Sequence, residues 1–279
     1  MPQTDQAAHE QDDSTSEAAR FRGSPFYAAL RRALARRGAR PEELCDCGDP
    51  ASRRLLSEYG AMFVAAEGVR VPRVLTFRSE EEVEQFQREA GPRAAEIGGF
   101  RVELQPAALD ALLGACDDAR AEGLSITPRG AVAARRGYAD TVRLWDSRVR
   151  PALEHWLGER KLDGEEADGL RALAPAEQLA EVLRLEARGL FFSKDWTKTI
   201  LQSVAAPGAS QHLAMLAFDA AEFTDPRVRE IFFRRGWFQT VLSDLPHFTF
   251  LGVREKDLPT LGLRRVEECG QSFWVPDLG

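Results

Sequence analysis

Four polar residues in the last third of the chain have the types and spacing of a zinc site. His212 and Asp219 lie seven residues apart, and His247 follows farther along the chain. Two imidazoles and one carboxylate are the protein ligands of many catalytic zinc sites, in which water takes the fourth position. A nearby carboxylate that does not bind the metal can act as general base on that water. Asp244, three residues before His247, is the candidate for this role.

The separation of the first two candidate ligands limits the backbone that can hold them. Seven residues rise about 10 Å along a continuous helix, and in a straight strand they place side chains on opposite faces. A shared metal therefore requires the chain to bend between His212 and Asp219, and we expect a loop followed by a strand. The turn signal Pro207-Gly208 lies just upstream. Because His-x6-Asp is common by chance, the alternative is that both histidines are core residues of a structural protein.

The other histidines and the cysteines are expected to be structural. His9 lies in an acidic N-terminal tail, and His155 lies beside Trp156 on a helical segment, where packing or a surface position is usual. The cysteines are Cys45, Cys47, Cys116 and Cys269. Only Cys45 and Cys47 are close in sequence, so the pattern favours reduced thiols in a reducing compartment over a disulfide framework or a thiolate metal site.

Two segments resemble the metal motifs of the VanY-like D-alanyl-D-alanine carboxypeptidases. Ser210-x-His212-x4-Ala217-x-Asp219 resembles the family signature S-x-H-x-x-G-x-A-x-D, and Asp244-x-x-His247 resembles the later element E-x-W-H. Upstream, Arg136-Gly137-Tyr138 is the best match to the end of the family segment S-G-Y-R-S-Y. The resemblance covers roughly residues 104–250.

The resemblance implies one zinc ion per chain, bound by His212, Asp219 and His247. It places Asp244 at the position of the catalytic glutamate. It also gives Arg136 the position of the arginine that holds a substrate carboxylate or orients the scissile carbonyl.

Arg129 and Arg135 are alternatives for the role of that arginine. Ser210 is expected to support the first metal ligand by a hydrogen bond. Lys194 and Lys198 belong to the aromatic and basic stretch FFSKDWTKT, where they either meet acidic groups of a peptide or belong to a packing insertion.

Three positions depart from the family pattern. Met215 replaces a glycine, Pro246 replaces the tryptophan before the last histidine, and Asp244 replaces a glutamate. The aspartate is one methylene shorter than the glutamate, so its reach to the attacking water decides whether the site is catalytic.

Three functions follow from these patterns. The resemblance implies a zinc metallopeptidase of the carboxypeptidase type, with a peptide substrate that is derived from the cell wall. The alternative on the same fold is a catalytically weakened or inactive module that binds metal or peptide. The third is the structural protein without a metal.

The elements that must hold these residues predict an α+β fold, with a small antiparallel sheet that carries the zinc site and is flanked by helices. The expected helices cover residues 24–38, 79–91, 106–123, 138–160, 175–188 and 226–236. The expected strands or strand ends cover residues 59–66, 73–77, 100–104, 124–127, 238–241, 247–250 and 273–276.

The chain is expected to contain three regions. By composition, residues 1–21 form a polar, acidic tail that is expected to be disordered. Residues 22–100 are expected to pack on the core. The resemblance implies that residues 101–279 form a VanY-like zinc peptidase domain with a helical insertion at about 145–204. The net charge of −7 argues against a nucleic-acid partner. The absence of a long apolar run predicts a protein without a membrane span, and the absence of an export signal predicts a cytoplasmic location. Because wall peptides lie outside the membrane, an incomplete N-terminus or another export route is the alternative. The oligomeric state is left open.

Overall fold

The computed structural model describes residues 16–242, 244–268 and 270–279. The α-helices are α2 (Pro25–Arg36), α3 (Pro41–Leu44), α4 (Pro50–Tyr59), α5 (Glu80–Ala90), α6 (Pro106–Ala121), α7 (Tyr138–Gly158), α8 (Gly164–Ala172), α9 (Gln178–Ala187) and α10 (Pro226–Arg234). The strands are β1 (Arg93–Ile97), β2 (Phe100–Leu104), β3 (Ala217–Asp219), β4 (Trp237–Phe238), β5 (His247–Phe250), β6 (Leu263–Glu268) and β7 (Gln271–Pro276). The 3-10 helices are η1 (Gly60–Val64), η2 (Ile200–Gln202), η3 (Gln211–Ala214) and η4 (Glu255–Leu261).

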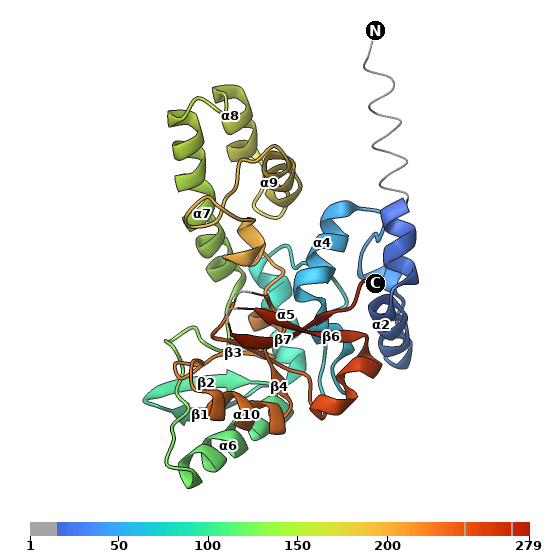
Figure 1. Ribbon diagram of the computed structural model, residues 1–279, viewed down its shortest axis with the longest axis vertical. Coiled ribbons are helices and arrows are strands. Elements are labelled where there is room, and N and C mark those ends of the chain that lie inside the picture. Colours follow the sequence, from blue (N-terminus) through green and yellow to red (C-terminus); the bar gives the residue numbers. More distant parts are fainter. Residues whose placement is uncertain (1–15, 243, 269) are drawn as a thin grey trace.

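The arrangement confirms the predicted α+β class with small antiparallel sheets. Figure 1 shows a helical arm of α7, α8 and α9 that extends away from the strands, while α6 and α10 lie beside the strands at the opposite end. Two hairpins, β1–β2 and β6–β7, accompany a three-stranded sheet with the order β3-β5-β4. No helix in the described ranges is both long enough and apolar enough to cross a membrane.

The three-stranded sheet is held by aromatic packing against α10. Phe232 of α10 stacks on Phe248 of β5, with ring centroids 4.2 Å apart, and also packs against Trp237 of β4. These three side chains are fully buried, and Phe218 of β3 joins the same cluster. Burial of large aromatic side chains dominates the energy of such a core, so the short strands that carry the candidate metal ligands rest on a rigid base.

Several helices begin and end where their local signals predicted. Ser24 accepts a hydrogen bond from the Tyr27 amide at the start of α2, and Ser79 caps α5 in the same way. Gly91 ends α5 in the left-handed conformation, at a φ of +59°. The helix predicted from residue 175 begins only at Gln178, because Ala174 and Glu177 form a turn instead. Caps act within one turn of the chain, which is why they can be read from sequence.

The predicted tail is too long. Residues 16–23 form a helix ahead of α2, in which Ala18 and Phe21 are buried. Phe21 packs edge-on against Tyr27, and this apolar contact anchors the end of the polar segment. The rest of the expected tail, including His9, lies outside the described residues.

Three predicted strands are wrong. The segment 59–66 is the end of α4 followed by η1, whose residues are all buried, so its aromatic and β-branched character reflects burial rather than strand pairing. In 73–77 only isolated backbone bonds form, from Leu75 to Leu44 and from Phe77 to Gly208. Residues 124–127 are not a strand, and an isolated bridge joins Pro128 to Ala220 just beyond them.

The insertion predicted at 145–204 corresponds to most of the helical arm, although α7 begins before it at Tyr138. His155 has the packing role that was expected, because its ring stacks on Trp196 at 3.9 Å and meets Trp156 edge-on. Lys194 is exposed on the loop after α9. Within the described residues, Lys194 makes no contact with the candidate metal ligands. Its role in binding a peptide substrate therefore stays a prediction.

Candidate metal centre

The backbone between the first two candidate ligands bends as the spacing required. His212 lies in the short 3-10 helix η3, and Met215 then takes a left-handed conformation with a φ of +53°. The chain continues directly into β3, which ends at Asp219. The expectation that no continuous helix joins the two ligands is confirmed.

The left-handed turn explains why a glycine would suit position 215. A residue with a Cβ pays roughly 1–2 kcal/mol in this conformation, whereas glycine adopts it freely. The Met215 side chain is fully buried, and its packing offsets the strain. The departure from the family pattern at this position is thus compatible with the same backbone path.

Strand pairing brings the other two ligands together. β3 and β5 are antiparallel, and Asp219 is the direct register partner of His247. Side chains of directly opposed residues in an antiparallel pair lie on the same face of the sheet, with Cβ atoms about 4.5–5.5 Å apart. The sheet therefore holds one carboxylate and one imidazole side by side, and η3 adds the second imidazole from the neighbouring turn.

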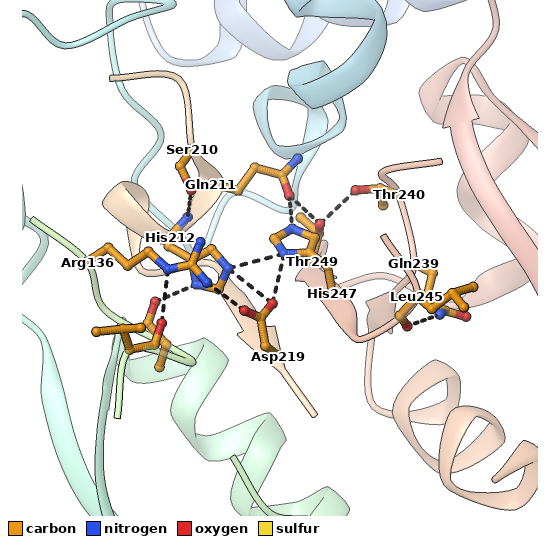
Figure 2. A network of polar contacts seen from close by, with 12 residues as sticks. Arg136, Ser210, Gln211, His212, Asp219, Gln239, Thr240, Leu245, His247 and Thr249 are labelled. Carbon is orange, nitrogen blue, oxygen red and sulfur yellow. Dashed lines mark hydrogen bonds and ion pairs between the residues drawn. The ribbon is translucent and has the colours of Figure 1, made fainter. Parts of the chain in front are cut away.

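The three side chains converge on one point (Figure 2). His212 Nε2 lies 3.2 Å from His247 Nδ1, and Asp219 Oδ1 lies 3.2 Å from each of these nitrogens. Both histidines are buried, and the Asp219 side chain is 15% exposed. This is the group of three residues, within the described ranges, whose ligand atoms are placed to hold a metal ion.

The outer nitrogen of each imidazole is bound to an oxygen. His212 Nδ1 donates to the Ala134 carbonyl at 2.7 Å, and His247 Nε2 lies 2.8 Å from the side-chain oxygen of Gln211. A neutral imidazole has one N–H and one lone pair, so donation outward leaves the inner nitrogen as an acceptor. Two lone pairs and a carboxylate oxygen therefore face one another.

The electrostatics keep protons away from His212 and Asp219 at neutral pH. Burial lowers the pKa of His212 from 6.5 to about 4, and the charge of Arg136 adds to the effect. For Asp219, burial alone would raise the pKa, but the polar groups around the carboxylate hold its pKa well below the ordinary value. The Arg136 guanidinium, 2.6 Å from Oδ2, stabilises the ionised form. The described site thus offers a neutral His212 beside an ionised carboxylate, which is the form that binds a metal.

Arg136 reaches the site, but its contact differs from the predicted one. Its Nη2 donates to Asp219 Oδ2 at 2.6 Å, and its Nε donates to the Val132 carbonyl at 3.0 Å. The guanidinium therefore binds the oxygen of Asp219 that does not face the histidines. Arg136 thus forms an ion pair with a candidate metal ligand, and its charge is not available to bind a substrate carboxylate.

The two alternative arginines point to different places. Arg135 donates to Gln87 at 2.7 Å and to Glu103 at 2.8 Å, so its charge is engaged away from the ligands. Arg129 is exposed and lies over the Phe223 ring, 5.6 Å from its centroid. The backbone N–H of Arg129 donates to the Asp219 carbonyl, which ties this exposed cation to the edge of the site.

Ser210 supports the first ligand through the backbone. Its hydroxyl accepts a hydrogen bond from the His212 amide at 3.4 Å and so caps η3. The imidazole itself is held by the Ala134 carbonyl. A residue two positions before the histidine reaches its amide, whereas the ring points across to residues 128–137.

Asp244 lies in the turn that leads into β5. Its carbonyl accepts the His247 amide at 3.1 Å, and its own amide donates to Val241 at 3.2 Å. The residue is exposed, and none of the described side chains forms a hydrogen bond with its carboxylate.

The carboxylate of Asp244 is nevertheless close enough to the metal ligands to feel their charges. Desolvation by the surrounding protein raises its pKa, the negative charge of Asp219 adds to the rise, and the charge of His247 opposes it.

The sequence did not indicate three groups that orient the candidate ligands. The Ala134 carbonyl binds His212, the Gln211 side chain binds His247, and the Thr249 hydroxyl binds Gln211. Gln211 and Thr249 are buried, and Gln211 is a polar residue at the start of a buried apolar run. Since buried polar side chains almost always have partners, a glutamine in this position signals a hydrogen-bonded network. Nothing local indicates the role of a backbone carbonyl 78 residues away.

The cysteines form no comparable cluster within the described residues. Cys45, Cys47 and Cys116 are free, and the sulfur atoms of Cys45 and Cys47 lie 3.9 Å apart. They have no third ligand of the kind that completes a metal site. Cys269 lies outside the described residues, and the structural role of the cysteines stays a prediction.

Comparisons with known proteins do not place the chain in a family. No family model, curated protein or solved structure matches the chain. The function of the chain can therefore be inferred only from the motif resemblance and from the geometry of the candidate site, which comprises His212, Asp219, His247 and Asp244.

Proposed function

We propose that this chain is a zinc-dependent metallopeptidase of the carboxypeptidase type. The observation that carries the proposal is the triangle of His212 Nε2, His247 Nδ1 and Asp219 Oδ1, with sides of 3.2 Å. In a tetrahedral zinc site with bonds of about 2.0–2.1 Å, neighbouring donor atoms lie about 3.3 Å apart. The donor set and its spacing fit zinc.

The protonation of the site supports a cation over a purely structural cluster. The outer hydrogen bonds direct an acceptor on each imidazole toward the ionised Asp219. Three acceptors that face one another in a buried place repel, and a positive ion among them removes the repulsion. A structural cluster of the same residues would instead be expected to place a donor between them.

The residues around the triangle can share the chemistry of peptide hydrolysis. A bound zinc ion would polarise the scissile carbonyl and lower the pKa of water toward about 7. Asp244 would accept the proton of the attacking water, because its carboxylate is exposed and no hydrogen bond to it is found among the described side chains. Burial by the surrounding protein raises the pKa of this carboxyl group. Arg136 holds Asp219 in its ionised form and orientation.

Arg129 is the cation that we assign to the terminal carboxylate of the substrate. It is exposed, it lies at the edge of the site, and its charge acts on Asp244. Arg136 and Arg135 are both occupied by protein carboxylates. The substrate class, peptidoglycan-type peptides with D-residues, rests on the motif resemblance.

The second candidate is a metal-binding or peptide-binding module without turnover. The shorter side chain of Asp244 favours it, since a displacement of about 1 Å at a reacting group can cost on the order of 100-fold in rate. The two candidates share the metal site and differ only in catalysis.

One experiment separates the candidates. The protein, purified without chelator and dialysed against zinc, is analysed for metals and then incubated with defined muropeptides, whose products are identified by mass spectrometry. We expect close to one equivalent of zinc and release of a terminal D-residue. Zinc without turnover supports the binding module, and less than about a tenth of an equivalent contradicts the metal site. Iron in place of zinc would contradict the peptidase, because the same donor set also serves iron(II) oxygenases.

A further inference from the structure

A buried chain of hydrogen bonds lies behind His247, on the side away from the metal ligands (Figure 2). Gln211 Nε2 donates to the Tyr59 carbonyl at 2.9 Å. Gln211 Oε1 lies 2.8 Å from His247 Nε2 and also accepts the Thr249 hydroxyl. The Thr249 hydroxyl in turn lies 2.7 Å from that of Thr240. Gln211, Thr240 and Thr249 are all buried.

The Tyr59 carbonyl fixes the direction of every bond in this chain. A backbone carbonyl can only accept, so the Gln211 amide must turn its NH2 group toward Tyr59 and its oxygen toward His247. With the amide flipped, two oxygens would face each other and the NH2 group would meet His247, a costly arrangement in a buried place. His247 must therefore carry its proton on Nε2, and Nδ1 keeps its lone pair.

We propose that Gln211 is the positioning residue that sets the tautomer of His247 and so makes Nδ1 a metal donor. The inference rests on the proposed metal site. Free histidine has two tautomers, and only the one with the proton on Nε2 presents an acceptor at the position that faces His212 and Asp219. Loss of the Gln211 oxygen removes the group that selects this tautomer.

The tautomer can be measured without metal or substrate. Long-range proton–nitrogen NMR on the metal-free wild-type protein distinguishes a protonated Nε2 from a protonated Nδ1. We expect His247 to be protonated on Nε2 at neutral pH. A His247 protonated on Nδ1 would overturn the inference, whether or not the protein later proves to be a peptidase.

Three variants then test the role of the amide. Gln211→Met keeps the length of the side chain and removes the acceptor, so we expect a mixture of His247 tautomers and a 10–100-fold loss in zinc affinity. Gln211→Glu, which in its protonated form can donate to Tyr59 and still accept from His247, should keep zinc affinity within about fivefold.

Thr240→Val is the matched control. It removes a hydroxyl from the same buried chain but leaves the contact between Gln211 and His247 intact. A purely structural role for Gln211 predicts that Gln211→Met and Thr240→Val both lower the melting temperature without changing the tautomer. Zinc affinity of folded Gln211→Met within about threefold of wild type would contradict the proposal.

Discussion

The two halves of the candidate site are held in opposite ways. His212, His247 and Asp219 are each bound from behind, by Ala134, Gln211 and Arg136. Asp244 and Arg129 are exposed, and among the described residues neither forms an ion pair with a protein side chain.

In the function that we propose, this difference separates the residues that bind the metal from those that act on the substrate. A metal site needs donors whose distances are fixed before the ion arrives, because reorganisation costs affinity. A base and a substrate-binding cation must instead remain free to meet a ligand. The fold therefore fixes the three candidate metal ligands in advance, whereas the roles that we propose for Asp244 and Arg129 depend on a substrate.

The largest effect is expected where a donor of the metal half is removed. His212→Ala and His247→Ala should each lose stoichiometric zinc, because two protein ligands rarely hold the ion tightly. The measurement is zinc content after gel filtration, with circular dichroism to verify folding. His155→Ala is the control, since that ring packs on Trp156 and Trp196 in the helical arm. A folded His212→Ala or His247→Ala variant that retains one equivalent of zinc would show that the substituted histidine is not a required ligand.

Changes at Asp244 should separate the two halves most clearly. Asp244→Ala and Asp244→Asn should keep zinc and lose about 10²–10⁴-fold in turnover, since positioned proton transfer contributes that much. Asp244→Glu should retain or raise activity if the backbone leaves room for the longer side chain. If Asp244 only shapes the turn before β5, both shorter variants would instead lose stability, and their activity would fall only in proportion to folded protein.

The metal-free protein should be destabilised by acid because His212 is buried in its neutral form. Its pKa is lowered from 6.5 to about 4, so the unfolded state binds the proton first and stability falls as pH drops from about 6.5 to 4. The depressed pKa of Asp219 acts in the same direction at still lower pH.

For His212 the loss amounts to about 3 kcal/mol at pH 4, measured by urea unfolding in the presence of a chelator. His212→Gln should flatten the slope between these pH values, whereas His155→Gln should leave it unchanged. An equal slope in His212→Gln would place the acid sensitivity elsewhere.

Arg136 and Arg135 provide an adjacent pair for the next test. Arg136→Gln removes the cation that holds Asp219 and should weaken zinc binding about 10–100-fold, as loss of an outer partner of a metal ligand typically does. Arg135→Gln, whose partner is Glu103, should bind zinc like wild type. Similar zinc affinities for the two variants would show that the ion pair between Arg136 and Asp219 does not affect zinc binding.

The smallest effect is expected at Arg129. Arg129→Ala should raise KM for a peptide with a free terminal carboxylate about tenfold, with kcat nearly unchanged and zinc retained, because it removes binding shared by ground state and transition state. The same substitution should not affect an amidated peptide. Lys194→Ala is the control, and an effect of Lys194 equal to that of Arg129 would contradict the assignment.

The sequence predicted the elements whose signals are local. Ser24, Ser79 and Gly91 mark the ends of α2 and α5 because a cap involves groups within one turn. The strand predictions at 59–66 and 73–77 were wrong because strand propensity measures how well a side chain suits a buried, pleated surface, and buried helices and loops use the same residues.

For the site, the sequence determined the donor types and the need for a bend between His212 and Asp219, since both follow from residue chemistry and chain geometry. The tertiary structure decided which atoms face one another at the candidate metal site. The hydrogen bonds that orient these side chains join residues far apart in sequence: 78 positions for His212 and Ala134, 83 for Arg136 and Asp219, and 152 for Gln211 and Tyr59. A hydrogen bond depends on position within a few tenths of an ångström and on which group can donate. Residue spacing along the chain carries neither, so the tautomers and the role of Arg136 emerge only when the fold brings these groups together.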